Sequence, residues 1–162
     1  MSSVSDSFSL ERMFTHRLHT LSKLTDRLTQ GAYLNDTGIA LSEGRCLSAI
    51  GSFTPLSVKD LAFRANLNKG QASRAAQSLV DQGLVRKEAS ATDGRGVVLT
   101  LTLEGEALWQ RLIQVIERRN DEIMSCLNAV EREQLDRLLD RLVAHARLAG
   151  KGGAETDEAL PG

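Results

Sequence analysis

Apolar residues recur at helical spacing in the first part of the chain. Steps of four and three residues separate the members of one stripe: Phe14, Leu18, Leu21, Thr25 and Leu28. This pattern predicts an amphipathic helix over residues 8–31, with Gly31 as its stop. The following segment, YLNDTGIALS, has the Asn-Asp and Gly punctuation of a loop. A second helix is expected from the cap Ser42 to about Gly51, with an apolar side formed by Cys46, Leu47 and Ile50.

A short helix, a turn and a longer helix are expected next. Ser57 is suited to cap the short helix, and Asp60 in its first turn suits the helix dipole. The turn is expected at Asn66–Asn68, and the longer helix over residues 69–82, closed by Gly83. The apolar positions expected to face inward are Leu61, Ala62, Ala72, Ala76, Leu79 and Val80.

Two β-like runs follow, at residues 84–88 and 96–101, on either side of the hairpin tip SATDGRG. Helix, turn, helix and two-stranded ribbon is the order of a winged helix-turn-helix, whose second helix fits the major groove of DNA. The expected fold class is therefore mainly α with a small β-wing. We assign residues 42–103 to this DNA-binding lobe.

Two more helices are expected after the ribbon. Thr102 caps the first, which extends to about Leu127, and Asn128 with Glu131 forms a variant of the capping box for the last, which extends to about Leu148. Their apolar stripes are Leu108, Leu112, Val115 or Ile116, Ile123 and Leu127, and then Leu135, Leu138, Leu139 and Leu142. A flexible N-terminus over residues 1–7 and a disordered tail over residues 149–162 complete the expected organisation.

The outer helices carry more apolar surface than one small unit can bury. Residues 8–31 and 104–148 are therefore expected to be the dimerisation helices of a homodimer, and a monomeric helical subdomain is the alternative. The composition agrees with a helical fold, because the 162 residues include only two prolines and 4% aromatics. The length fits one domain with a core of aliphatic side chains.

Charge is unevenly distributed along the chain. The net charge of −1 is not the basic balance often seen in nucleic-acid binders. Between residues 59 and 95, however, seven cationic and four anionic residues give a net charge of +3, and the rest of the chain carries −4. The positive excess coincides with the expected DNA-binding lobe.

Other classes of protein find little support in the sequence. The Ser-rich start has no apolar run, so no targeting signal is expected, and no stretch is long enough to span a membrane. These features predict a cytoplasmic protein. Cys46 and Cys126 have apolar neighbours and look like small core residues rather than a disulfide framework. No phosphate loop, nucleophile elbow or metal-ligand spacing occurs, so we expect neither an enzyme nor a bound cofactor or metal.

The order of the motifs resembles the MarR family of bacterial transcription regulators, over about residues 8–148. The resemblance rests on LSEGRCLSAI, PLSVKDLA, NKGQASRAAQSLVDQGLVRK and DGRGVVLTLTLEGEAL. The last of these is similar to the family's wing, with its Asp-x-Arg, and to the Leu-Thr-x-x-Gly that opens the next helix. Glycines on both sides of Arg95 depart from the pattern of many relatives and imply a more flexible wing tip.

The second helix of the motif supplies the residues expected to read DNA: Lys69, Gln71, Ser73, Arg74 and Gln77. Gln pairs bidentately with adenine and Arg with guanine, while hydroxyls and Lys contact phosphates or base edges. By resemblance, Arg74 matches an Arg that is nearly standard in the family. For Lys69, Gln77 and Arg74 an ordinary solvated helix surface is the alternative. Ser57 and Lys59 begin a helix expected to cross the DNA backbone and bind phosphate.

The wing is expected to add further DNA contacts. Arg95 at its tip is expected to enter the minor groove. The resemblance implies that Asp93 holds Arg95 through an ion pair, and a solvated turn residue is the alternative. Arg86 and Lys87 are expected to attract phosphate at the wing base. A symmetric dimer then predicts a double-stranded, pseudo-palindromic operator with half-sites about one helical turn apart.

The resemblance also implies a small-molecule site between the dimer helices and the DNA-binding lobe, often for aromatic acids. Arg45, in a helix with apolar neighbours, is a candidate to bind a carboxylate bidentately, and an internal salt bridge is the alternative. His16 and His19 either hydrogen-bond a ligand or belong to a solvated face, and they do not make a metal site by themselves. Trp109 either lines the pocket or packs in the core. The stripe on the first helix that contains both His residues is Arg12, His16, His19 and Lys23.

These expectations describe a homodimeric repressor that an aromatic or heteroaromatic carboxylate releases from its operator. The overall sequence is similar to regulators of nicotinate-type catabolism. Two alternatives stay open: a winged-helix module for protein–protein contact, and a thiol redox sensor of the same fold. The second would need an activated, accessible cysteine, usually near the start of the first helix, and both cysteines lie elsewhere.

Overall fold

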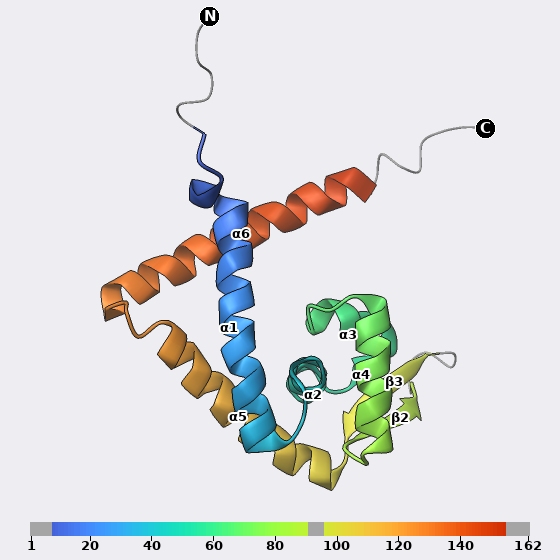
Figure 1. The fold of residues 1–162 in the computed structure, drawn as a ribbon. Coiled ribbons are helices and arrows are strands. Elements are labelled where there is room, and N and C mark those ends of the chain that lie inside the picture. The colour runs from blue at the N-terminus through green and yellow to red at the C-terminus, as the bar shows by residue number, and fades with distance from the viewer. Residues whose placement is uncertain (1–7, 91–95, 155–162) are drawn as a thin grey trace, which may run out of the picture. The chain divides into compact units, whose positions relative to one another are not determined.

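The computed structural model describes residues 8–90 and 96–154, with side chains as far as Lys151 (Figure 1). The chain divides into two compact units, residues 1–119 and residues 120–162. The elements in chain order are η1 (Leu10–Arg12), α1 (Phe14–Thr37), α2 (Leu41–Ser52), β1 (Leu56–Ser57), α3 (Val58–Arg64), α4 (Lys69–Asp81), β2 (Val85–Ala89), β3 (Val97–Leu101), α5 (Leu103–Ile123) and α6 (Ala129–Ala154). The mainly helical fold with a small β-wing is confirmed.

Helix α1 is longer at its C-terminal end than the sequence suggests. It starts at Phe14, after the 3-10 turn η1, and continues through Gly31 to Thr37. The predicted stop at Gly31 is therefore wrong, and the predicted loop after it is shortened to residues 38–40. The ring of Tyr33 is buried against α2, where a Cβ on Gly44 would lie 2.4 Å from two ring carbons. This packing favours helix beyond Gly31, and the helix ends at Gly38, whose φ is 74°.

Helix α2 begins without the cap predicted at Ser42. Ala40 is the N-cap residue, and its N–H donates to Glu43 Oε1 at 3.1 Å. The N–H of Leu41 donates to Gln30 Oε1 of α1 at 2.7 Å. The free donors of the first turn are thus satisfied partly from another helix, which local sequence rules do not reveal.

The winged unit contains one strand that the sequence did not suggest. Its antiparallel sheet has the order β1-β3-β2, with Leu56 and Lys87 on either side of Leu99. Strand β1 has only two residues, too few to show an alternating pattern. The predicted cap at Ser57 is confirmed, since its hydroxyl accepts from the Asp60 N–H at 3.1 Å. The tight turn between α3 and α4 has Asn66 at a φ of 53°.

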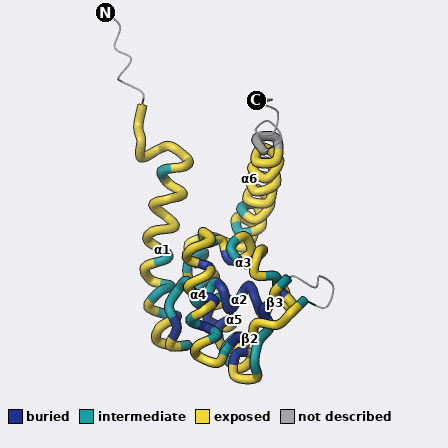
Figure 2. The backbone as a smooth tube through the Cα atoms, turned by 90° about the vertical axis from the view of Figure 1, so that its right-hand side faces the viewer, coloured by how far each residue is buried: buried dark blue, intermediate teal, exposed yellow. Residues whose placement is uncertain are grey.

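The core of the first unit gathers between α2, α3, α4, α5 and the sheet (Figure 2). Its largest fully buried side chains are Leu47, Ile50, Leu61, Leu79, Leu99, Leu112, Val85 and Cys46. The inward positions predicted at Leu61, Ala72, Ala76 and Leu79 are confirmed. Ala62 and Val80 are half-buried at the edge of this core.

Helices α1 and α6 are exposed over most of their length (Figure 2), and each carries large apolar side chains on one exposed face. On α1 these are Phe14, Leu18, Leu21, Leu24 and Leu28, with exposed fractions of 45–65%. On α6 they are Leu138, Leu139, Leu142 and Val143, with exposed fractions of 41–53%. Contiguous apolar surface of this kind marks an interaction site.

The caps predicted for the last two helices are confirmed. Thr102 Oγ1 accepts from the Gly105 N–H at 3.0 Å, and Asn128 Oδ1 accepts from the Glu131 N–H at 2.9 Å. However, α5 ends at Ile123, before the predicted residue 127. The turn that follows is held by Arg132, whose Nε donates to the carbonyls of residues 124 and 127 at 3.2 and 3.3 Å.

Helix α6 also reaches further than expected. It continues to Ala154, so residues 149–154 of the predicted disordered tail are helical. The remainder of that tail, residues 155–162, and the predicted flexible residues 1–7 lie outside the described residues. Within the described part of the chain, no helix is long and apolar enough to cross a membrane.

We predict that Gly105→Ala destabilises the protein by about 2–3 kcal/mol, because overpacking forces the backbone apart. A Cβ at Gly105 would lie 1.8 Å from the Leu84 carbonyl oxygen, so the first turn of α5 would have to move away from the start of β2. Urea unfolding followed by circular dichroism measures the loss. Leu103→Ala is the matched control, since Leu103 is 84% exposed. Equal midpoints for Gly105→Ala and wild type would contradict this close approach.

Candidate nucleic-acid interface

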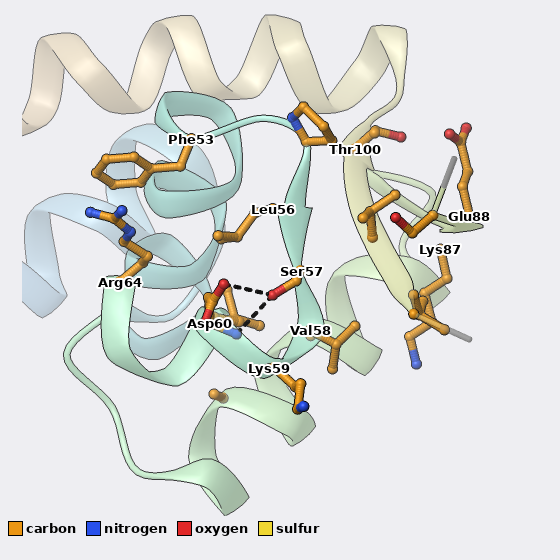
Figure 3. Close-up of a pocket in the computed structure, with 18 of the residues that line it drawn as sticks. Phe53, Leu56, Ser57, Val58, Lys59, Asp60, Arg64, Lys87, Glu88 and Thr100 are labelled. Carbon is orange, nitrogen blue, oxygen red and sulfur yellow. Dashed lines mark hydrogen bonds between the residues drawn. The ribbon is translucent and has the colours of Figure 1, made fainter. Parts of the chain in front are cut away.

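A groove of about 1750 Å³ lies between α3, α4 and the wing (Figure 3). Its floor is apolar and includes Leu56, Leu61, Ala72 and Ala76. Cations outnumber anions among its lining residues: Lys59, Arg64, Lys69 and Lys87 against Asp60 and Glu88. The guanidinium of Arg64 stacks on the Phe53 ring, 4.3 Å from its centroid. A groove with this charge balance suits a polyanion such as the DNA backbone.

The start of α3 forms one wall of this groove. The Ser57 hydroxyl donates to Asp60 Oδ2 at 2.9 Å and also accepts from the Asp60 N–H. Ser57 is therefore occupied as a cap, and any phosphate contact by its hydroxyl would compete with the Asp60 carboxylate. Lys59, two residues after Ser57, is exposed and lines the groove (Figure 3).

Helix α4 presents a polar face opposite its buried alanines. Ala72, Ala75, Ala76 and Leu79 are buried, and the predicted reading set is exposed: Lys69, Gln71, Ser73, Arg74 and Gln77. The structure divides this set between two sides of the helix. Lys69 and Ser73 line the large groove, whereas Gln71 and Arg74 line a smaller groove of about 290 Å³ against α2.

The first turn of α4 is well ordered by local hydrogen bonds. Asn68 Oδ1 accepts from the Gln71 N–H at 2.8 Å, and Gln71 Oε1 accepts from the Asn68 N–H at 3.3 Å. This reciprocal capping box holds the carbonyl side of the Gln71 amide. Arg74 lies back over Gly70, where a Cβ would be 3.2 Å from its Nη1. Its guanidinium is thus placed at the N-terminal turn of the helix.

Gln77 and Lys87 contact each other. Lys87 Nζ donates to Gln77 Oε1 at 2.9 Å, and Gln77 Nε2 donates to Asp81 Oδ1 at 2.8 Å. The two residues therefore tie the wing to α4, and pairing of Gln77 with a base would require these bonds to break. Arg86, also at the wing base, lies 3.9 Å from Glu88, a pair exposed enough to contribute little. Asp93 and Arg95 at the wing tip lie outside the described residues.

The candidate ligand residues do not form one cluster. Arg45 Nη2 lies 2.9 Å from Asp26 Oδ1, so the internal salt bridge considered above is present. His19 precedes Asp26 by seven residues on α1, roughly 10 Å along the helix axis. His16 and Arg12 come before His19 and are therefore still further from Asp26. Neither histidine nor Arg12 is placed beside the Arg45 guanidinium. Among the described residues, no three His, Cys, Asp or Glu side chains are grouped as metal ligands would be.

Aromatic side chains pack against α2 near both of its ends. Burial raises the pKa of Tyr33; Arg45 opposes that shift and Asp26 adds to it. Trp109 is half-buried and packs over α2, where a Cβ on Gly51 would lie 2.3 Å from its Nε1. Its buried Nε1–H has no hydrogen-bond partner among the described residues. Trp109 is thus at the edge of the core and carries a donor that no described residue uses.

Four residues that organise this region are absent from the candidates predicted from the sequence. Asp26 pairs with Arg45, and Glu43 Oε2 accepts from Ser78 Oγ at 2.8 Å and from Gln82 Nε2 at 2.6 Å. The partners are separated by 19, 35 and 39 residues along the chain. No short-range spacing connects them, so the sequence carried no signal for these pairs.

Comparison with known proteins identifies the fold and the family. The family model described as MarR family matches residues 37–96, from the end of α1 to the wing. The HTH-type transcriptional repressor Rv2887 of Mycobacterium tuberculosis is 30% identical over 111 residues, which are 68% of this chain and 80% of that protein. The chain belongs to the MarR family of transcriptional regulators. This confirms the resemblance seen in the sequence.

Solved structures of MarR-family proteins share the fold. The structure of Rv2887 from M. tuberculosis in complex with p-aminosalicylic acid has a TM-score of 0.66 and 25% identity, and covers 80% of this chain and 98% of that one. A mutant MarR from Escherichia coli in complex with operator DNA has a TM-score of 0.71 and 24% identity, and covers 84% of this chain and 99% of that one. The winged helix-turn-helix is therefore confirmed.

We predict that Arg74→Ala weakens binding to a cognate operator by about 1–3 kcal/mol and relaxes base preference at one position. Lys69→Ala is the charge-matched control, and it is expected to weaken binding to all sequences alike. Fluorescence anisotropy with the operator and its single-base variants separates the two effects. Equal affinity of Arg74→Ala and wild type would remove Arg74 from the reading set.

The two cysteines have different environments, which corrects the expectation that both lie in the core. Cys46 is buried, and desolvation, assisted by the Glu43 carboxylate, raises the pKa of its thiol to about 12. Cys126 is exposed in the turn between α5 and α6. The thiolate is the reactive form, so the Cys46 thiol is unreactive at neutral pH.

We therefore predict that iodoacetamide at pH 8 modifies one thiol of the folded protein, and that mass spectrometry places it on Cys126. Cys126→Ser should abolish the modification, whereas Cys46→Ser should leave its rate unchanged. In urea both thiols of the wild type should react. Rapid modification of Cys46 in the folded protein would contradict its burial and reopen the redox-sensor alternative.

Proposed function

We propose that this protein is a homodimeric transcriptional repressor that binds a pseudo-palindromic operator and leaves it when a small aromatic carboxylate binds. The observation that carries the proposal is the exposed polar face of α4 beside a cation-lined groove. A helix presented in this way fits the major groove, with phosphates held at its flanks. The repressor Rv2887, a member of the same family, supports the direction of regulation.

The homodimer is supported by the exposed apolar faces of α1 and α6. The α1 face alone exposes five large side chains, from Phe14 to Leu28. Burying such a face against a symmetry-related copy would stabilise both chains by about 25 cal/mol for each Å² of apolar surface removed from water. Two copies of α4 would then read half-sites about one helical turn apart.

Two observations support an aromatic carboxylate as the ligand: the position of Arg45 and the structures of the relative Rv2887. Rv2887 has been solved with p-aminosalicylic acid and with salicylic acid. In this chain Arg45 is held by one carboxylate already, Asp26, in a half-buried pair. A ligand carboxylate would take the place of Asp26 on the guanidinium, with Tyr33 and Trp109 near α2 as aromatic surroundings. Nicotinate is a heteroaromatic acid of the same chemistry.

A selection experiment tests the DNA-binding part of the proposal. The wild-type protein is incubated with random-sequence duplexes, and the retained DNA is sequenced over several rounds. We expect a pseudo-palindromic consensus whose binding weakens steeply with salt, because phosphate neutralisation releases counterions. No enrichment, together with salt-independent retention, would favour the protein–protein interaction module instead.

We predict that Asp26→Asn tightens binding of salicylate or nicotinate, and that Arg45→Ala weakens it at least about tenfold, as expected for a charge-assisted hydrogen bond. Asp26→Asn removes the internal competitor for the guanidinium. Isothermal titration calorimetry measures both affinities, and Arg141→Ala, an exposed α6 arginine, is the control. Equal ligand affinity in Arg45→Ala and wild type would remove Arg45 from the ligand site.

A further inference from the structure

Both carboxylate oxygens of Glu43 accept hydrogen bonds, and one of them connects α2 to the recognition helix. Oε1 caps its own helix by accepting from the Ala40 N–H at 3.1 Å. Oε2 reaches α4, where it accepts from Ser78 Oγ at 2.8 Å and from Gln82 Nε2 at 2.6 Å. Gln82 Nε2 also lies 3.1 Å from Ser78 Oγ, so the three side chains form one closed cluster. We refer to Glu43, Ser78 and Gln82 as the Glu43 clamp.

The same first turns of α2 are tied to α1. Arg45, two residues after Glu43, pairs with Asp26 at 2.9 Å. The N–H of Leu41 donates to Gln30 Oε1 at 2.7 Å. The start of α2 is therefore held between an ion pair on the α1 side and the Glu43 clamp on the α4 side.

Close packing leaves little room for α2 to change its internal conformation. Gly44 lies under the Tyr33 ring and Gly51 lies under the Trp109 indole, each at a distance that would exclude a Cβ. Leu47 and Ile50 between them are fully buried. A packed helix segment of this kind shifts as a unit rather than deforming continuously.

The small groove beside α4 places the clamp next to the reading residues. It is lined by Ser42 and Glu43 from α2 and by Gln71, Arg74, Ala75 and Ser78 from α4. Ser78 follows Arg74 by four residues, one turn along the same helix. A change in the position of Ser78 relative to α2 is therefore also a change in the position of Arg74.

We propose that Glu43 is the positioning residue through which α2 sets the recognition helix, so that a change at the Arg45–Asp26 pair reaches Arg74 by way of the Glu43 clamp. The proposal rests on the proposed repressor function, since it concerns how that function is regulated. The proposal gives Glu43 no contact of its own with DNA or ligand. It acts through Ser78 and Gln82.

A double-mutant cycle on DNA affinity tests the proposal without a ligand. Asp26→Asn breaks the ion pair, and Glu43→Gln weakens the clamp while keeping an oxygen for the Ala40 N–H. The probe is a duplex selected by the wild-type protein from random sequence, and anisotropy gives Kd for wild type, both single variants and the double variant. We expect Asp26→Asn to change Kd at least fivefold in the wild-type background and less than twofold in the Glu43→Gln background. Distant, unconnected sites give equal factors in both backgrounds.

An equal factor for Asp26→Asn in both backgrounds, or no effect in either, would overturn the coupling. Ser78→Ala combined with Gln82→Ala provides a second way to open the clamp, and it replaces Glu43→Gln if that variant unfolds. Ser125→Ala is the control, because the Ser125 hydroxyl donates to the carbonyl of Glu122 within its own turn. Failure of the wild type to enrich any duplex would refute the repressor function instead, so the two failures are distinguishable.

Discussion

Two aromatic rings pack directly on two glycines of α2, and the arrangement of the first unit depends on these contacts. Tyr33 from α1 covers Gly44, and Trp109 from α5 covers Gly51, at distances that a single methyl group would prevent. Because both rings lie directly against the α2 backbone, no side chain fits at either glycine, and Leu47 and Ile50 of the same helix are completely buried. In the winged unit, α4 and the sheet pack against this helix.

The central position of α2 also explains why polar side chains join it to its neighbours. Arg45 and Glu43 extend from adjacent turns toward α1 and α4, where each finds an oppositely charged or hydrogen-bonding partner. Partly buried charges need such partners, since removing them from water is costly. The same interactions that satisfy these groups connect the side of α2 that faces the proposed ligand residues to the helix that is expected to read DNA.

The interface proposed for DNA combines local and long-range order. The reading residues of α4 lie on a helix whose caps and buried alanines come from residues close together in the sequence. Their surroundings are not: the Gln77–Lys87 bond, the groove shared by α3 and the wing, and the contact between Glu43 and Ser78 all join residues from separate elements. The proposed reading of bases therefore depends mainly on local helix signals, and its proposed regulation depends on contacts between separate elements.

The amino-acid sequence alone specifies the winged helix-turn-helix, because caps such as Ser57 and Thr102 and the spacing of the buried side chains act over a few residues. It also determined which face of α4 is exposed. The continuation of α1 past Gly31, the pairing of β1 with the sheet and the Arg45–Asp26 ion pair depend instead on packing between distant parts of the chain. In each of these cases the stabilising partner comes from another element, and distances between elements are set by packing rather than by local propensity.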